Sequence, residues 1–188
     1  MLFTRALITS AFAMAATALP KAAPSATSSG TAASPSASSG SSSGGGGGGG
    51  VQIVNNLNTT VYLWSTASDA GSMQKLNSGG GTYSEDWQTN SDGGGISIKM
   101  STSQSEDSVL QFEYTTSDDD LYWDLSCIDL DSSSAFVSAG FSASPDDSSC
   151  SSVSCSAGDS NCAEAYQQSD DKDTNSCSSS SAFTVTLG

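Results

Sequence analysis

The sequence contains no histidine, and its 188 residues include only five lysines and arginines beside 20 aspartates and glutamates. Histidine is the side chain that most often serves as a general base or metal ligand near neutral pH, so its absence excludes mechanisms and metal centres built on imidazole. Binding to nucleic acid or anionic lipid requires a basic surface, which this composition does not supply. We therefore expect no nucleic-acid partner, no metal and no other cofactor.

No stretch is long and apolar enough to cross a bilayer. The longest apolar run, residues 6–18, is shorter than the roughly 20 residues that a spanning helix needs. It follows Arg5 and ends in Ala16-Thr17-Ala18, which is the pattern of a secretory signal with a small-residue cleavage site. We predict a signal peptide over residues 1–18 and no membrane span. Because residues 182–188 lack the hydrophobic tail of a GPI signal, the mature chain is expected to be extracellular, released or held at the cell wall.

Residues 19–50 have almost no charge and few large apolar side chains. They consist mainly of Ala, Ser, Pro, Thr and Gly, and end in seven consecutive glycines. Such a segment cannot bury enough apolar surface to offset the entropy lost on ordering. We predict a disordered linker with a reach of about 30 Å. Its hydroxyl side chains either carry O-linked sugars or form a bare spacer.

The remaining residues, 51–188, form a single predicted domain. All 20 acidic residues lie in it beside three lysines, which gives it a net charge of −17. A domain of this length buries roughly two-thirds of its unfolded surface, enough for one core. So acidic a balance favours solubility outside the cell.

Short segments of alternating apolar and polar residues recur along this domain, separated by Gly, Ser and Asn. Residues 51–56 and 60–64 flank the turn residues Asn55 to Asn58, and we predict that they form a hairpin. Asn58-Thr59-Thr60 on that turn is an N-glycosylation sequon. Further strands are expected at residues 96–100, 109–114, 121–130, 135–141 and 182–187. Without a helical period, the pattern predicts an all-β sandwich or barrel.

Residues 121–130 are the densest apolar run of the domain, and we predict a strand with two distinct faces. Leu121, Trp123, Leu125 and Cys127 alternate on one face, which should press into the core. The other face carries Tyr122, Asp124 and Ser126. An acidic site, if the protein has one, is therefore expected on or near this strand.

Three tryptophans and one acidic run allow further predictions. Trp64 and Trp123 are expected to pack in the core, whereas Trp87, amid acidic residues, is the candidate for exposure and stacking on sugar rings. Residues 118–120 are three aspartates, which form either an ordinary acidic turn or a cation site. Because they lack the spacing and glycine of a known calcium loop, we predict a turn.

The domain contains five cysteines, which in a secreted chain favour disulfides, although sequence alone leaves their connectivity open. They belong to a series of blocks that resembles the thaumatin-like proteins. Residues 53–64 resemble the start of that family, and residues 122–129 resemble its aromatic-Asp-Val-Ser-x-Val-Asp segment. The third block has Cys150-x4-Cys155, then Cys162-x-x-Ala-aromatic, an Asp and Cys177, and the closing strand follows.

The small size and low cysteine count most resemble the fungal subgroup, the antigenic thaumatin-like or Blastomyces yeast-phase-specific protein family. The resemblance implies a single-domain, disulfide-stabilised antiparallel β-sandwich. It also implies the disulfides Cys150–Cys177 and Cys155–Cys162, which leave Cys127 over. Cys127 is then a buried free thiol on the strand's apolar face or, alternatively, the site of an intermolecular bridge. We expect a monomer.

Larger thaumatin-like proteins carry a cleft with one Arg, one Glu and three Asp, associated in some members with binding or slow hydrolysis of β-1,3-glucan. The resemblance matches Asp124 and Asp129 to two of these aspartates, and Asp170 or Asp171 to the third. Lys99 falls near the Arg, keeping its charge but not its bidentate fork. Gln111 stands where the Glu is expected, with Glu113 beside it. The candidate glycan-contact residues are therefore Lys99, Glu113, Tyr122, Asp124, Asp129 and Asp170.

Two departures from the family weaken the case for catalysis. Asp124 and Asp129 have opposite strand parity, so both face one cleft only if the strand bends or ends between them. Six residues between Cys155 and Cys162 replace the domain that walls the cleft in larger members. Because an open groove excludes little water, a raised carboxyl pKa is hard to maintain there.

We therefore assign no catalytic residue and predict a non-enzymatic secreted or wall-associated fungal surface antigen. Its expected partner is β-glucan, another wall polysaccharide or a host surface protein, contacted through the acidic face. One alternative is a weak enzyme that binds or hydrolyses β-1,3-glucan through Asp124, with Asp129 or Glu113 as the second carboxyl. The other is a secreted effector that acts on a host protein, with the scaffold as bare architecture.

Overall fold

The computed structural model describes residues 49–188, which form two β-sheets and one short helix. The predicted signal peptide lies outside the described residues, as does the predicted linker except for its last two glycines. No described helix has the length and apolar character needed to cross a membrane.

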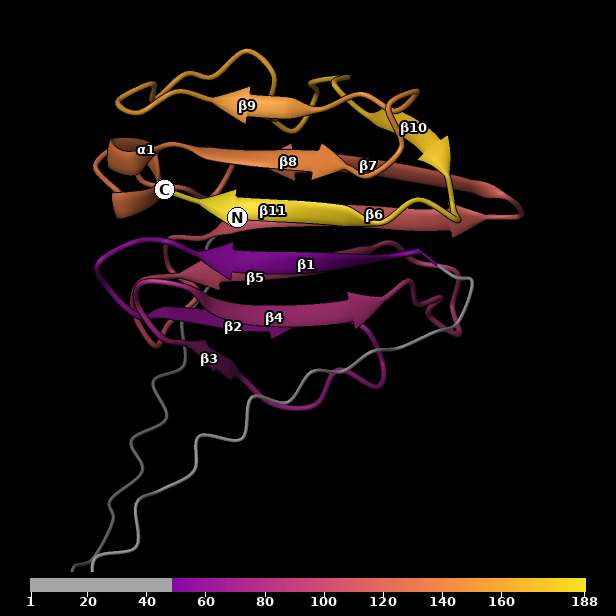
Figure 1. Cartoon of the computed structure of the whole chain (residues 1–188), viewed down its shortest axis with the longest axis horizontal. Coiled ribbons are helices and arrows are strands. Elements are labelled where there is room, and N and C mark those ends of the chain that lie inside the picture. The colour runs from indigo at the N-terminus through magenta and orange to yellow at the C-terminus, as the bar shows by residue number, and fades with distance from the viewer. Residues whose placement is uncertain (1–48) are drawn as a thin grey trace, which may run out of the picture. The chain divides into compact units, whose positions relative to one another are not determined.

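The sheets pack face to face, as the family resemblance implied (Figure 1). Sheet A runs in the order β4 (Gly81–Asp86), β1 (Gly50–Asn55), β11 (Phe183–Leu187), β8 (Phe141–Pro145), β9 (Val153–Cys155). Sheet B runs in the order β10 (Asn175–Ser178), β7 (Asp120–Ser126), β6 (Leu110–Ser117), β5 (Ile96–Ser101), β2 (Val61–Ser65), β3 (Gln74–Leu76). Neighbouring strands are antiparallel except β1 and β11, which are parallel. The predicted all-β, antiparallel-rich sandwich is confirmed.

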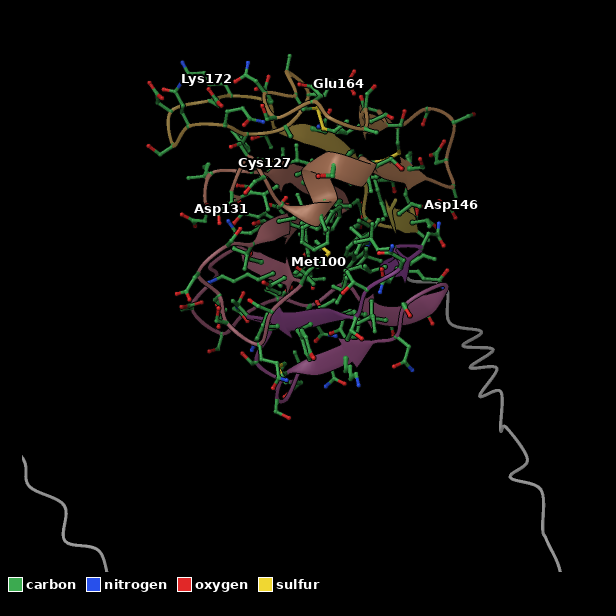
Figure 2. All side chains as sticks on the ribbon, turned by 90° about the vertical axis from the view of Figure 1, so that its left-hand side faces the viewer. Met100, Cys127, Asp131, Asp146, Glu164 and Lys172 are labelled. Carbon is green, nitrogen blue, oxygen red and sulfur yellow. A yellow bond between two sulfur atoms is a disulfide. The ribbon has the colours of Figure 1, made fainter. Side chains whose placement is uncertain are left out.

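The core lies between the two sheets and is built from alternate residues of each strand. In β7 the predicted inner face is confirmed, because Leu121, Trp123 and Leu125 are fully buried. Met100 of β5 lies among these side chains between the sheets (Figure 2). Burial of each large apolar side chain contributes about 1.5–3 kcal/mol. The strands are therefore held by one shared core, and their outward-facing residues are free for other roles.

The predicted hairpin of residues 51–64 is wrong, because β1 and β2 lie in different sheets. Strand β1 pairs with β4 and β11, whereas β2 pairs with β3 and β5. The side chain of Asn55 is fully buried and donates hydrogen bonds to the backbone oxygens of Thr59, Leu76 and Asn77. These bonds hold the turn as a crossing between sheets. Local alternation could not reveal this crossing, because it does not specify a strand's partner.

The strand predicted for residues 135–141 is also wrong in its first part. Residues Ala135–Ala139 form the helix α1, and β8 begins only at Phe141. The Ser134 side chain caps the helix by accepting a hydrogen bond from the Val137 N–H at 3.2 Å. Gly140 ends the helix with a φ of 84°, which favours glycine. This cap and stop are the signals that the sequence interpretation missed.

Two of the three tryptophans lie elsewhere than predicted. Trp64 is half-buried on the outer face of sheet B, because it alternates with the core residue Leu63. Trp87 packs against the core rather than standing exposed, with its ring 4.8 Å from that of Tyr114 and 6.0 Å from that of Phe183. Its indole N–H donates to the Ser181 backbone oxygen at 3.1 Å. Its acidic neighbour Glu85 is buried too and accepts a hydrogen bond from the Tyr114 hydroxyl at 2.6 Å, so local polarity misled the prediction.

The structure contains the two disulfides that the resemblance implied. Cys150 pairs with Cys177 and Cys155 with Cys162, at Cα–Cα distances of 5.4 and 5.5 Å. Cys127 is a free cysteine, but it is half-buried and lies just past the end of β7 at Ser126. The expectation of a buried thiol on the apolar face of the strand is therefore corrected.

Candidate functional site

The candidate site lies on the outer face of sheet B, where register brings polar side chains of three strands into rows. One row runs from Ser97 on β5 through Glu113 on β6 to Asp124 on β7. A neighbouring row runs from Lys99 through Gln111 to Ser126. Each of these residues alternates with a buried core residue of its strand, which is why all of them face outward.

Glu113 and Asp124 stand directly opposite each other on antiparallel strands. Such pairs place their Cβ atoms about 4.5–5.5 Å apart, so the two carboxyl groups interact strongly. One oxygen of Asp124, Oδ1, is buried and has no hydrogen-bond partner among the described residues. Burial, and secondarily the charge of Glu113, raises the pKa of Asp124 to about 7. Asp124 therefore takes up a proton near neutral pH, at which most aspartates are ionised.

The pKa of Glu113 is also raised, chiefly by burial. The nearby positive charge of Lys99 and the neighbouring Ser97 hydroxyl act in the opposite direction, while the charge of Asp129 adds to the rise. Lys99 itself forms an ion pair with Glu106 at 2.9 Å rather than with either site carboxylate. The carboxyl groups of Glu113 and Asp124 are thus both partly desolvated, and the cationic side chain of Lys99 lies near Glu113.

Glu113 and Asp124 line an open depression of about 310 Å³, which we call the acidic depression. Tyr122 on its rim has a side chain 42% exposed, so its ring is available for stacking. The lining is completed by backbone and side chains of Gly95, Ile96, Ser97, Tyr114, Thr115 and Thr174. Two carboxyl groups, three serine and threonine side chains and an exposed aromatic ring therefore meet in one place.

The loop after Cys162 pairs with the edge of β7 beside this face. The N–H of Tyr166 donates to the Leu125 oxygen at 2.9 Å, and the Tyr166 oxygen accepts from the Cys127 N–H at 2.8 Å. Ser126 is completely buried, although the sequence placed it on the exposed face. Thr174 directly precedes β10, whose pairing of Asn175 with Trp123 brings it to the acidic depression, and its hydroxyl is hydrogen-bonded to that of Tyr166.

Asp129 approaches this site only in part. Strand β7 ends at Ser126, which removes the parity obstacle between Asp124 and Asp129. Asp129 is exposed in the following turn and acts on Glu113 through its charge. Its backbone oxygen accepts a hydrogen bond from the Val109 N–H at 3.0 Å.

The remaining aspartate candidate, Asp170, is exposed and does not line the acidic depression. Its neighbour Asp171 accepts hydrogen bonds from the N–H groups of Gln167 and Gln168 at 2.7 and 2.9 Å, which stabilises its own loop. Gln111 accepts from the Ser97 hydroxyl at 3.0 Å and brings no charge. The residues matched to the family's third aspartate and to its glutamate therefore add no carboxyl group to the acidic depression.

Three hydroxyl-bearing residues of the site escaped the sequence interpretation. Ser97 has the same strand parity as Lys99, and Thr115 has the same parity as Glu113, so parity alone could have identified both. Thr174 had no such signal, because it reaches the site through the pairing of β10 with β7 and its hydrogen bond with Tyr166. Residues 118–120 include the turn between β6 and β7, and no group of three acidic or cysteine side chains in residues 49–188 is arranged to hold a metal ion.

Comparisons with known proteins agree with this architecture. Residues 45–188 match the family model described as "Blastomyces yeast-phase-specific protein". The chain is 52% identical over 138 residues to a secreted thaumatin-like protein, calA, of Emericella nidulans, covering 73% of this chain and 80% of that protein. It is 42% identical over 136 residues to an antigenic thaumatin-like protein of Arthroderma benhamiae, covering 72% of this chain and 68% of that protein. Among solved structures it resembles the protein elicitor MoHrip2 from Magnaporthe oryzae, with a TM-score of 0.61 and 26% identity over 74% of this chain and 98% of that chain.

Proposed function

This chain belongs to the Blastomyces yeast-phase-specific protein family of secreted thaumatin-like proteins, and we propose that its acidic depression binds a glycan without cleaving it. The observation that carries the proposal is the Glu113–Asp124 pair in an open depression beside the exposed ring of Tyr122. The favoured ligand is β-1,3-glucan or another wall polysaccharide.

The chemistry of the lining suits a sugar. An ionised carboxylate accepts hydrogen bonds from sugar hydroxyls, and a protonated carboxyl both donates and accepts. With its pKa raised to about 7, Asp124 is protonated in mildly acidic surroundings and offers both functions there. Its buried, unpartnered Oδ1 gains a partner when a ligand hydroxyl binds. The exposed ring of Tyr122 offers an apolar surface to the face of a sugar ring.

A weak glucan hydrolase is the second candidate, and one observation favours it. Glu113 and Asp124 lie directly opposite each other, so rotation of their side chains can bring the carboxyl groups to the roughly 5–5.5 Å found in retaining glycosidases. In that case Asp124 would be the acid and Glu113 the nucleophile. The exposed residues between Cys155 and Cys162 supply no second wall to exclude water, so we favour binding.

The test is calorimetric titration of the secreted chain with a soluble β-1,3-gluco-oligosaccharide at about pH 5.5. We expect saturable binding that is weakened at least about tenfold by Asp124→Ala, since this variant removes both the donor and the acceptor that the protonated carboxyl offers to sugar hydroxyls. Asp119→Ala, in the exposed turn, is the matched control and should bind as the wild type does. Release of reducing ends by the wild type but not by Asp124→Asn would favour the hydrolase as the function of this site.

A host surface protein is the alternative partner. That reading is supported by the 26% identity to a chain described as a protein elicitor, and it needs no sugar contact at the acidic depression. If no oligosaccharide binds, or if the Asp124 variant binds it with the affinity of the wild type, the glycan proposal is wrong. The effector alternative would then be pursued with a host protein as ligand.

A further inference from the structure

The two facing carboxyl groups of the acidic depression have no cation as a partner within residues 49–188. The one ion pair in this part of the chain joins Lys99 to Glu106, and none of its three lysines lines the depression. Like charges directly opposite each other on neighbouring strands are destabilising. A bound cation would remove this repulsion, whereas a neutral ligand would leave it in place.

The depression is also rich in hydrogen-bond acceptors. Oδ1 of Asp124 is buried and has no partner among the described residues, which is unfavourable for an ionised carboxylate. The Ser97 hydroxyl donates its proton to Gln111 at 3.0 Å, so its lone pairs are free to accept. Thr115 is exposed in the next row, opposite Tyr122. The side chains of the lining therefore favour a ligand with several donors.

An ammonium group matches this set of acceptors better than a metal ion does. It has three N–H donors, and one row of the sheet presents three acceptors, namely the Ser97 hydroxyl and the carboxyl groups of Glu113 and Asp124. Calcium takes about six to eight oxygen ligands, which is more than this row holds. The charge and the number of acceptors thus both favour a protonated primary amine.

The surroundings of the carboxyl pair indicate what carries the amine. Tyr122 is the next outward residue of β7, about 6.8 Å from Asp124 along the strand, and its side chain is 42% exposed. Its ring attracts a cation and packs against the apolar face of a sugar. Thr115 and Thr174 add hydroxyls to which a sugar can hydrogen-bond, whereas the aliphatic stem of a lysine side chain cannot. An amino sugar therefore uses more of the lining than a basic peptide does.

We propose that the acidic depression selects sugars with a free, protonated amine over neutral sugars, and holds the ammonium group between Glu113 and Asp124. This inference rests on the proposed glycan binding and specifies the chemical class of the ligand, such as a deacetylated amino-sugar polymer. The net charge of −17 on residues 51–188 attracts such a polymer from a distance. Acetylation of the amine removes the charge and should remove the preference.

Binding of an ammonium group should release a proton from the carboxyl pair. Burial, and secondarily the charge of Glu113, raises the pKa of Asp124 to about 7, so at about pH 6 this carboxyl group is largely protonated in the free protein. A cation beside it favours the ionised form and lowers its pKa. Lys99 and Asp129 also act on Glu113, in opposite directions. A neutral sugar brings no charge and should release no proton.

The experiment is calorimetric titration of the full secreted chain at about pH 6 with three ligands. These are oligomers of glucosamine, the same oligomers with every amine acetylated, and a soluble β-1,3-gluco-oligosaccharide. We expect the amine form to bind at least about tenfold more tightly than the acetylated form. Proton release should appear as a dependence of the measured heat on the ionisation enthalpy of the buffer.

Two double variants with the same change in net charge separate the site from general attraction to an acidic protein. Glu113→Gln with Asp124→Asn keeps the size and hydrogen-bonding groups of the pair but removes both charges, and should abolish the preference for the amine. Asp118→Asn with Asp119→Asn removes two charges from the turn between β6 and β7 and should preserve the preference. The comparison of ligands on the wild type needs no variant, so a misfolded variant leaves the proposal testable.

The outcomes distinguish this inference from the proposed glycan binding. Equal affinity for the amine and acetylated oligomers would overturn the inference, as would an equal loss of the preference in both double variants. If the β-1,3-gluco-oligosaccharide still binds in either case, the glycan proposal stands. If no oligosaccharide binds, both are wrong.

Discussion

The outer face of sheet B presents Glu113 opposite Asp124, whereas the outer face of sheet A presents rows of serine and threonine. Both faces consist of residues that alternate with the same core. They differ in burial, because Asp124 is half-buried beside Glu113 whereas Thr184 on the outer face of sheet A is exposed. Burial of the Asp124 carboxyl, and secondarily the charge of Glu113, raises its pKa. The comparison teaches that local burial sets the protonation of a carboxyl group on this sandwich.

Removing a disulfide should have the largest effect, because each disulfide restricts the unfolded chain by closing a loop. Cys150 and Cys177 are 27 residues apart, and the chain-entropy model attributes about 3.6 kcal/mol to such a loop. For Cys155–Cys162, seven residues apart, it attributes about 2.5 kcal/mol. The paired Cys→Ser variants should lose these free energies of unfolding in chemical denaturation. In the Cys155→Ser, Cys162→Ser variant the pKa of Asp124 should also fall, because a loosened loop lets water reach its carboxyl group. An unchanged pKa would mean that this loop does not contribute to the desolvation of Asp124.

Asp124→Asn should change the pH dependence of stability. Because the pKa of Asp124 is raised from 3.8 to about 7, the folded state binds more protons than the unfolded state between these values. The wild type should therefore lose stability as pH rises through that window and level off above it. Asp124→Asn should lack this loss, on the order of 1–2 kcal/mol after allowance for solvent screening. The measurement is urea denaturation from about pH 4 to 8, with Asp119→Asn as the unaffected control.

Lys99→Met should raise the pKa of Glu113 further, since the charge of Lys99 opposes the effect of burial. Its effect on the free energy of unfolding should stay within about 1 kcal/mol, because the ion pair with Glu106 is solvent-exposed. NMR titration of side-chain carboxyl carbons reports the pKa directly. Lys75→Met on strand β3 is the control that leaves Glu113 unchanged. A lower pKa of Glu113 in Lys99→Met would contradict the proximity inferred from the structure.

Thr184→Asp should have the smallest effect and sharpens the comparison most directly. It places a carboxyl group on the outer face of sheet A, at an exposed position of β11. We expect its pKa to lie near the ordinary value of about 3.9 and the free energy of unfolding to change by no more than about 0.5 kcal/mol. A strongly raised pKa of this carboxyl group, measured by NMR, would show that burial does not explain the raised pKa of Asp124.

Much of the fold could be read from residue patterns. The inner face of β7 followed from alternation, because a half-buried strand needs apolar residues at every second position. The disulfide partners followed from the family resemblance. The crossing between β1 and β2 was missed because the hydrogen bonds of Asn55 join residues far apart in sequence, whereas the helix α1 was missed although Ser134 and Gly140 signal it locally.

The features of the candidate site likewise divide into those that the sequence predicted and those that it could not. The sequence by itself determined the absence of histidine, the acidic charge and the outward parity of Glu113, Tyr122 and Asp124, because these depend on composition or on neighbours along one strand. Only the tertiary structure decided that Glu113 faces Asp124, that Thr174 joins them and that Asp170 does not line the depression. Strand register and loop cover arise from contacts between distant segments. Those contacts set the desolvation that raises the pKa of Asp124, which no local pattern encodes.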